Sequence, residues 1–390
     1  MTDPQGTTQS QATASAAAAG YSKGLEGVIA AQTALSLVDG TNSKLFYRGI
    51  PVNELTENST FEETIYLLWK GALPKAAELA EFRKKLAAQR KAPKEVLDLL
   101  KKFPMKSHPM GVLRSIVSVF GLYDKKADTI DNEGNQLKAL RLTAVFPTLI
   151  AAFHRYRLGK KPIDPNPLLS QAGNFLYMMH GKAPEKEMEK AMDAYLILLA
   201  DHGLNASTFS ARVTCATQSD MYSAVTAAIG TLKGDLHGSA NQRAMEMILD
   251  IGKPEKAEAY VLELLAQKKK VMGFGHRIYK SEDPRATAFR KIAADLCERA
   301  GDKTWMEISN RVEKVMWDKK QIPCNVDFFS ASVLYILGFP IDFFTTVFAA
   351  SRVAGWTAHV IEQLSDNRLI RPAADYTGPR DQHYIPIEKR

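Results

Sequence analysis

The run from residue 273 to 285 combines the residue types of an anion site with an acid–base group beside it. Its two glycines allow the backbone to approach a ligand closely, and His276 directly after them titrates near neutral pH. Asp283 and the proline after it are typical of a helix start. Arg285 then stands in the first helical turn, where the helix dipole disfavours a cation. We therefore infer that an anionic ligand binds here, next to His276.

Two more histidines, His202 and His237, stand beside glycines at predicted helix boundaries. Ser239 and Gln242 form a predicted capping box, which places His237 just outside a helix. Taken singly, each histidine is more often a capping or structural residue than a functional one. Because three of the eight histidines share this context, the pattern favours a functional role for them.

Asp327 and Arg352 are the charged residues in strongly apolar surroundings. Asp327 precedes two phenylalanines at a predicted helix start, where the helix dipole lowers a carboxyl pKa and burial raises it. The sequence leaves open which effect is larger; a raised pKa would make Asp327 a stronger base. Arg352 lies among apolar neighbours, so we expect it to pair with a carboxylate of the protein or of a ligand. Arg371 belongs to a predicted extended tail and can reach another surface.

Several other site types are absent from the sequence. The two glycines before His276 lack the third glycine of a dinucleotide fingerprint, because position 278 is isoleucine. The sequence contains no P-loop, no HExxH and no nucleophile elbow, and it indicates no metal site. Its three cysteines form no metal-ligand spacing and no CxxC pair, which favours a reduced, cytoplasmic protein.

The composition is that of a globular protein with one large domain or two. The net charge of +8 favours anionic ligands, among which nucleic acid is one possibility, but the lysines are mostly scattered as on solvated helix faces. Residues 1–20 resemble neither a secretory nor a transit peptide, and we expect a disordered tail. The apolar stretch 328–350 contains Asp342 and a Gly-Phe-Pro break, so it predicts two buried helices meeting at a turn rather than a membrane span.

The predicted architecture is mainly α, with a short β-hairpin or two short strands near the N-terminus. The strands are expected at 28–31 and 45–49 and a turn at 39–42. Strand–helix alternation is missing, which excludes a parallel α/β sheet. The pattern predicts a helix starting near residue 60 and further helices at 75–91, 110–123, 136–157, 166–180, 184–201, 207–217, 220–233, 239–251, 254–268, 285–300, 302–319, 326–338 and 341–364.

From about residue 24 to 379, the chain resembles the citrate synthase family, which includes citrate synthase and 2-methylcitrate synthase. The most specific segment is Gly-x-Gly-His followed by Asp-Pro-Arg in residues 273–285. Other segments resemble the family in the same order: 201–207, 237–238, 325–328, 351–356 and 371–372.

The resemblance implies a homodimer of subunits with two helical domains that close over the substrates. The large domain would comprise residues 21–237 and 339–390, and the small domain residues 238–338. Because His276 and Asp327 are far apart in the sequence, we expect domain closure to bring them together.

The resemblance also implies a role for each candidate residue. Asp327 would take a proton from the methyl group of acetyl-CoA, His237 would hydrogen-bond the thioester oxygen, and His276 would polarise and protonate the ketone of oxaloacetate. Oxaloacetate would be held by His202, Arg285, Arg352 and, from the neighbouring subunit, Arg371. The CoA contacts would be Val271, Met272, Gly273, Phe274, Gly275 and Lys280. The family reaction uses the CoA thioester as a substrate and needs no metal or permanently bound cofactor.

Two alternatives to citrate synthesis stay open. The first is 2-methylcitrate synthesis from propionyl-CoA, or activity with both thioesters, because one methylene usually discriminates by only about 1–3 kcal/mol. The run His276-Arg277-Ile278-Tyr279 is closer to the citrate form than the His-Pro-Val-Tyr of dedicated methylcitrate enzymes. The second is a non-enzymatic helical scaffold or RNA-binding protein. The filled catalytic positions argue against it, and so do basic runs without interleaved aromatics. We expect no nucleic-acid or membrane partner.

Overall fold

The computed structural model of the protein describes residues 21–279 and 281–390. These residues belong to two units. One is Thr33–Ile370, and the other contains residues 21–32 and 371–390. In the second unit, the regular structure is limited to the 3₁₀ turns η1 (Lys23–Leu25) and η4 (Ile387–Lys389), and most side chains are exposed. The predicted disordered tail at 1–20 lies outside the described residues.

A small antiparallel sheet opens the larger unit. Its strand order is β1-β2-β3, and Leu37 pairs with Phe46. The predicted turn at 39–42 is confirmed, because the Asp39 carboxylate accepts hydrogen bonds from the backbone N–H groups of Thr41 and Asn42. The predicted strand at 28–31 is wrong, since these residues form no regular structure. The strands are β1 (Ser36–Asp39), β2 (Lys44–Tyr47) and β3 (Ile50–Pro51).

The rest of the larger unit is helical, as the apolar periodicity predicts. The helices are α1 (Val52–Asn58), α2 (Phe61–Lys70), α3 (Ala76–Ala88), α4 (Lys94–Leu100), α5 (Pro109–Leu122), α6 (Asn132–Arg157), α7 (Gln171–His180), α8 (Lys186–Leu199), α9 (Ala206–Ala216), α10 (Met221–Leu232), α11 (Ala240–Ile251), α12 (Ala257–Ala266), α13 (Pro284–Ala300), α14 (Thr304–Lys320), α15 (Val326–Ile336) and α16 (Phe344–Ser365). Two short 3₁₀ turns, η2 (Pro254–Lys256) and η3 (Ile341–Phe343), precede α12 and α16.

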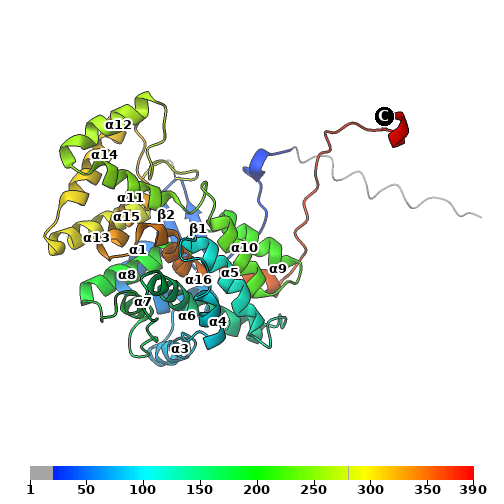
Figure 1. The fold of residues 1–390 in the computed structure, drawn as a ribbon, viewed down its shortest axis with the longest axis horizontal. Helices are drawn as coiled ribbons and strands as arrows, with labels where there is room; N and C mark the ends of the chain where they lie inside the picture. The colour runs from blue at the N-terminus through cyan, green and yellow to red at the C-terminus, as the bar shows by residue number, and fades with distance from the viewer. Residues whose placement is uncertain (1–20, 280) are drawn as a thin grey trace, which may run out of the picture. The chain divides into compact units, whose positions relative to one another are not determined.

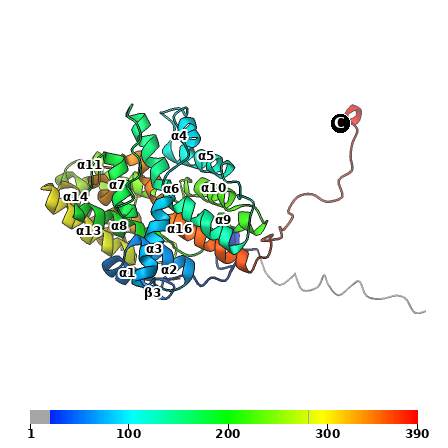
Figure 2. The ribbon, with the colours of Figure 1, turned by 90° about the horizontal axis from the view of Figure 1, so that it is seen from below.

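Helix α16 forms the centre of the core. It lies among the other helices of the larger unit (Figures 1 and 2) and packs against α2, α6, α8, α9 and α10. Nearly all its side chains are buried. Gly355 allows this helix to approach the turn after α8, because a Cβ atom there would lie 2.3 Å from the carbonyl oxygen of Ala200. The helix therefore sits directly against residues 200–201.

Helices α11 to α15 pack on one another and lie together at the upper left of Figure 1. They correspond to the predicted small domain, but the larger unit includes them without a break, so the domain boundaries at 238 and 338 stay a prediction. The stretch 328–350 forms α15, a turn and α16, as expected. Among the described helices, α6 is long and apolar enough to cross a membrane, but it is a core helix with most of its residues buried.

Candidate active site

The loop that carries His276 fixes which nitrogen of the imidazole bears the proton. Its Nδ1 accepts hydrogen bonds from the backbone N–H groups of Ile278 (3.0 Å) and Tyr279 (3.1 Å). Because backbone amides only donate, Nδ1 is unprotonated and Nε2 carries the proton. Burial, with nearby Arg285, lowers the pKa of His276 to about 4. At neutral pH, His276 is thus a neutral donor through Nε2.

His237 lies in the turn between α10 and α11, facing the start of α9. The backbone N–H of Ser207 donates to its Nε2 (3.2 Å), and the Ser207 hydroxyl lies 2.8 Å from the same nitrogen. The proton of His237 is therefore on Nδ1. Burial, followed by Arg352, lowers its pKa to about 4. The predicted capping box beside it is wrong, because the Ser239 side chain makes no capping bond to α11.

His202 contacts the loop that carries His276. Its ring lies edge-on to that of His276, with centroids 5.4 Å apart. Its Nε2 lies 3.3 Å from the hydroxyl of Tyr279, which is buried. Burial, with Arg285 and Arg352, holds the pKa of His202 well below its usual range. His202 and His276 therefore form one cluster of neutral imidazoles beside two cations.

Arg285 is buried and paired with the residue that caps its own helix. Its Nε and Nη2 donate to the two carboxylate oxygens of Asp283 at 3.0 and 2.8 Å, and its backbone N–H also donates to Asp283. Burial opposes the charge of Arg285, but Asp283 outweighs burial and raises its pKa. The charge of Arg285 near the helix start is thus compensated by Asp283 of the protein itself, whereas the sequence pattern predicted an anionic ligand as its partner.

Arg352 is a buried cation without such a carboxylate. Its Nε donates to the carbonyl oxygen of Leu199 (2.7 Å), and its guanidinium lies over the ring of Phe348 (4.8 Å). Burial lowers its pKa to about 10. No carboxylate of the described residues bonds to Arg352. Of the two partners expected from the sequence, a carboxylate of the protein or one of a ligand, the structure therefore favours the ligand.

Asp327, whose protonation the sequence left open, has a raised pKa in the structure. Its backbone N–H donates to the Asn325 side chain at the start of α15 (3.0 Å). Burial raises the pKa of its carboxyl to about 7, although Arg285 and Arg352 oppose this. Burial therefore dominates, and Asp327 titrates where a general base is effective at neutral pH.

The segments that carry His276 and Asp327 are already joined. The backbone N–H of Asn325 donates to the Gly273 carbonyl oxygen (2.9 Å), and that of Gly275 donates to the Pro323 carbonyl oxygen (3.0 Å). The expectation that closure must bring these two segments together is therefore wrong. Gly273 itself is required by packing and backbone, because its φ is +83° and a Cβ atom would lie 2.8 Å from Phe328.

A buried polar network behind His202 was missed by the sequence analysis. The Asp201 carboxylate accepts from the Ser36 hydroxyl (2.5 Å) and lies 3.3 Å from His359 Nε2. Arg212 contacts His359 Nδ1 (2.9 Å) and pairs with Glu362 (2.7 Å). Because Arg212 only donates, Nδ1 of His359 is unprotonated and its Nε2–H faces Asp201. The signal available in the sequence was Asp201 directly before His202.

For the remaining predicted site residues that the structure describes, it gives burial but no contact that indicates a role. Val271 and Gly273 are buried, and Met272, Phe274 and Gly275 are partly buried. Lys280 lies outside the described residues. Arg371 is exposed and belongs to the second unit, so its contribution to a neighbouring subunit's site stays a prediction.

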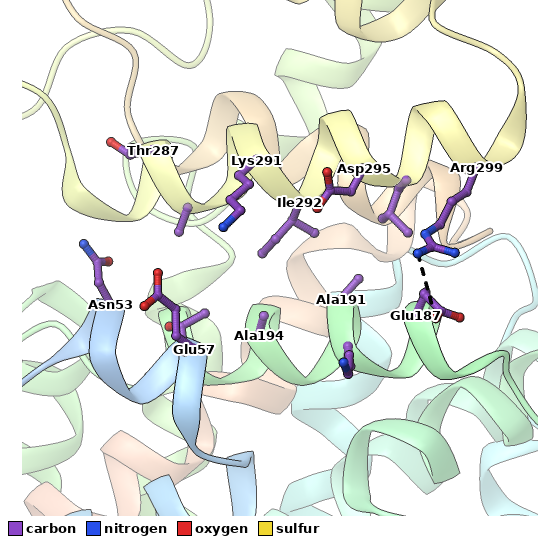
Figure 3. Close-up of a pocket in the computed structure, with 14 residues that line it drawn as sticks. Asn53, Glu57, Glu187, Ala191, Ala194, Thr287, Lys291, Ile292, Asp295 and Arg299 are labelled. Carbon is purple, nitrogen blue, oxygen red and sulfur yellow. Dashed lines mark ion pairs between the residues drawn. The ribbon is translucent and has the colours of Figure 1, made fainter.

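A cavity of about 530 Å³ lies between α1, α8 and α13 (Figure 3). Its lining contains both acidic and basic side chains, and Arg299 of α13 pairs with Glu187 of α8 across it (3.9 Å). The cavity shares no residue with the histidine cluster, so it lies outside the candidate active site.

Among the described residues, no three His, Cys, Asp or Glu side chains gather to hold a metal ion. The expected absence of a cofactor stays a prediction.

Comparisons with known proteins show which family the chain belongs to. The family model "Citrate synthase, C-terminal domain" matches residues 24–373. Citrate synthase 2 of Bacillus subtilis is 48% identical over 94% of this chain and 99% of its own, and a 2-methylcitrate synthase of Shewanella oneidensis is 44% identical over 94% and 97%. A solved complex of Thermoplasma acidophilum citrate synthase with carboxymethyl coenzyme A and oxaloacetate has a TM-score of 0.90 and 34% identity, covering 95% of this chain and 100% of that one. The chain belongs to the citrate synthase family.

Proposed function

We propose that this protein condenses acetyl-CoA with oxaloacetate and water to give citrate and CoA. The observation that carries the proposal is the pairing of Asp327, with a pKa of about 7, with a neutral His276 on segments bonded to each other. A base and a hydrogen-bond donor held in this way suit a carbon–carbon condensation, in which one substrate loses a proton and the other gains one.

In the proposed reaction, Asp327 removes a proton from the methyl group of acetyl-CoA. The Nδ1–H of His237 hydrogen-bonds the thioester oxygen as negative charge develops on it, and the N–H of Ser207 keeps that tautomer. The new carbon–carbon bond forms at the ketone of oxaloacetate, whose oxygen takes a proton from Nε2 of His276. Water then cleaves the citryl thioester: its hydroxyl stays on the new carboxyl group and CoA leaves as the thiol. The proton held by Asp327 returns through solvent to Nε2 of His276, which restores both groups.

Two buried arginines, Arg285 and Arg352, would bind the carboxylates of oxaloacetate, although Asp283 already balances the charge of Arg285. Arg352 supports this best, because its charge is buried beside no bonded carboxylate of the described residues. We also propose that Arg371 from a second subunit completes the grip in a homodimer, and that Lys280 and the 271–275 backbone contact CoA. We further propose a cytoplasmic location, which fits three buried cysteines without disulfides, and a role in the tricarboxylic acid cycle, which follows from the proposed reaction.

Oxaloacetate-dependent release of thiol from acetyl-CoA tests the proposal, and its absence in folded protein would refute it. The same assay with propionyl-CoA separates citrate from 2-methylcitrate synthesis, since relatives of both kinds match. We expect kcat/KM to be higher for acetyl-CoA, with propionyl-CoA retaining measurable activity because a methylene discriminates by only about 1–3 kcal/mol. A higher kcat/KM for propionyl-CoA would favour the 2-methylcitrate alternative.

Arg352→Leu should raise KM for oxaloacetate by roughly 30- to 4,000-fold, because truncating one partner of a buried charge pair costs about 2–5 kcal/mol. The substrate-free variant should be at least as thermostable as the wild type, because it loses a buried charge without a bonded carboxylate. Steady-state kinetics and thermal unfolding measure both effects. Arg299→Leu, at an exposed ion pair, is the matched control. An unchanged KM would contradict the role of Arg352.

A further inference from the structure

Two segments beside the candidate active site, 273–275 and 323–325, are joined by backbone hydrogen bonds. Residues 273–275 run antiparallel to 323–325, with an isolated bridge between Phe274 and Cys324. The Phe274 ring also packs on Phe328 of α15, with centroids 4.7 Å apart. The backbone bridge and the ring contact therefore connect the loop before His276 to the start of the helix that carries Asp327.

The Asn325 side chain adds a bond at each end of this connection. Its Oδ1 accepts from the backbone N–H of Asp327 (3.0 Å), and its Nδ2 donates to the Gly275 carbonyl oxygen (2.8 Å). A carboxamide carries both a donor and an acceptor, so it can satisfy these two opposite groups at once. One side chain thus bridges from the residue before His276 to Asp327.

Asp283 makes a second connection to the same helix start. Its Oδ2 accepts from the backbone N–H of Val326 (3.2 Å) and from Nη2 of Arg285 (2.8 Å). The carboxylate is buried, and nearby Arg285 keeps its pKa below the usual range although burial opposes this. Arg285 is therefore held to the start of α15 as well.

We propose that Asn325 is a positioning residue that fixes Asp327 relative to His276, so that the base and the proton donor are held as one rigid body with Arg285. This inference rests on the proposed function, because it assigns a purpose to the alignment of those two groups. Condensation requires both groups to be aligned with the reacting carbons, and a displacement of about 1 Å can cost about 10²-fold in rate. His237 and Arg352 come from other elements, the turn before α11 and helix α16.

The two bonds of Asn325 can be separated by substitution. Asn325→Ser keeps an acceptor for the helix start but is too short to reach the Gly275 carbonyl, whereas Asn325→Ala loses both bonds. We expect kcat to fall by about 10–100-fold in both variants. The melting temperature should fall further in Asn325→Ala than in Asn325→Ser, because alanine loses the helix cap as well as the bond to Gly275. KM for oxaloacetate should change little in either variant. Asp220→Ser, at the N-cap of α10, is the matched capping control and should keep full turnover.

Turnover should therefore depend on the bond to Gly275, and the difference in thermal stability between the two variants should report the helix cap. Wild-type kcat in Asn325→Ser would overturn the proposal, because it would leave Asn325 as a capping residue only. A larger kinetic isotope effect with methyl-deuterated acetyl-CoA is expected in Asn325→Ser, since proton removal becomes slower than the other steps. An unchanged isotope effect together with unchanged kcat would count against it.

Hydrogen exchange in the wild-type protein gives a test that depends on no variant. Peptides covering 273–279 and 323–329 should exchange at the same slow rate, as one cooperative unit. Much faster exchange of one segment would overturn the rigid connection. Wild-type protein that releases no thiol with oxaloacetate would instead refute the proposed function, and the exchange measurement would still decide the connection.

Discussion

Asp327→Asn should lower kcat by about 10²–10⁴-fold while the protein stays folded, because a positioned general base contributes about that much. Asparagine keeps the size of the side chain and the Asn325 bond to the backbone N–H of residue 327, but it cannot accept the methyl proton. Thiol release at saturating substrates measures the effect. Asp318→Asn, on the exposed face of α14, is the control. Near-normal kcat in Asp327→Asn would contradict the assignment of the base.

The raised pKa of Asp327 predicts two opposite trends with pH. For the free enzyme, kcat/KM should rise as the pH increases through about 7, because only the ionised carboxyl accepts a proton. Stability should change the other way. Between the ordinary pKa of 3.8 and about 7, the folded state binds more protons than the unfolded state. The advantage of the neutral carboxyl, complete below the lower value, is therefore lost as the pH rises through the higher one.

Asp327→Asn isolates this contribution, because asparagine does not titrate. Its melting temperature relative to the wild type should increase from about pH 5 to about pH 8. Thermal unfolding at several pH values measures the difference. A constant difference across that range would mean that the Asp327 carboxyl titrates at its ordinary value in the folded protein.

The helical part of the fold was predictable because apolar residues recur with helical period over long segments. Residues 220–233 and 341–364, for example, were predicted as helices and form α10 and a 3₁₀ turn followed by α16. α1 and α4 were missed, since seven residues make fewer than two turns and show little periodicity. The strand predicted at 28–31 failed because apolar residues alone do not supply a pairing partner.

The site was predictable as a set of residue types but not as a set of bonds. Glycine-flanked histidines and an arginine at a helix start are visible in the sequence. The contact between Ser207 and His237, and the one between His359 and Asp201, join distant positions and depend on how α9 and α16 pack. The pKa of Asp327 was undecidable from sequence for the same reason, because burial is a property of the packed structure.

His276→Asn should lower kcat by about 10²–10³-fold, the usual loss when one preorganised donor to a developing oxyanion is removed. Asparagine was chosen because its amide oxygen can accept from the backbone N–H groups of Ile278 and Tyr279, as Nδ1 does now. The turn is thereby kept while the Nε2–H is lost. KM for acetyl-CoA should change much less than kcat, since the donor acts on the ketone of oxaloacetate.

His108→Asn is a matched control for His276→Asn, because Nδ1 of His108 also accepts a backbone N–H, from Met110, at the start of α5. A loss of turnover in both variants would point to a general effect of the substitution rather than to proton donation.

The pKa of His276 near 4 adds an independent check. Between pH 6.5 and 4 the unfolded state binds more protons, so acid destabilises the wild type through this residue. His276→Asn should therefore lose less stability on acidification, and an unchanged acid sensitivity would contradict a neutral His276.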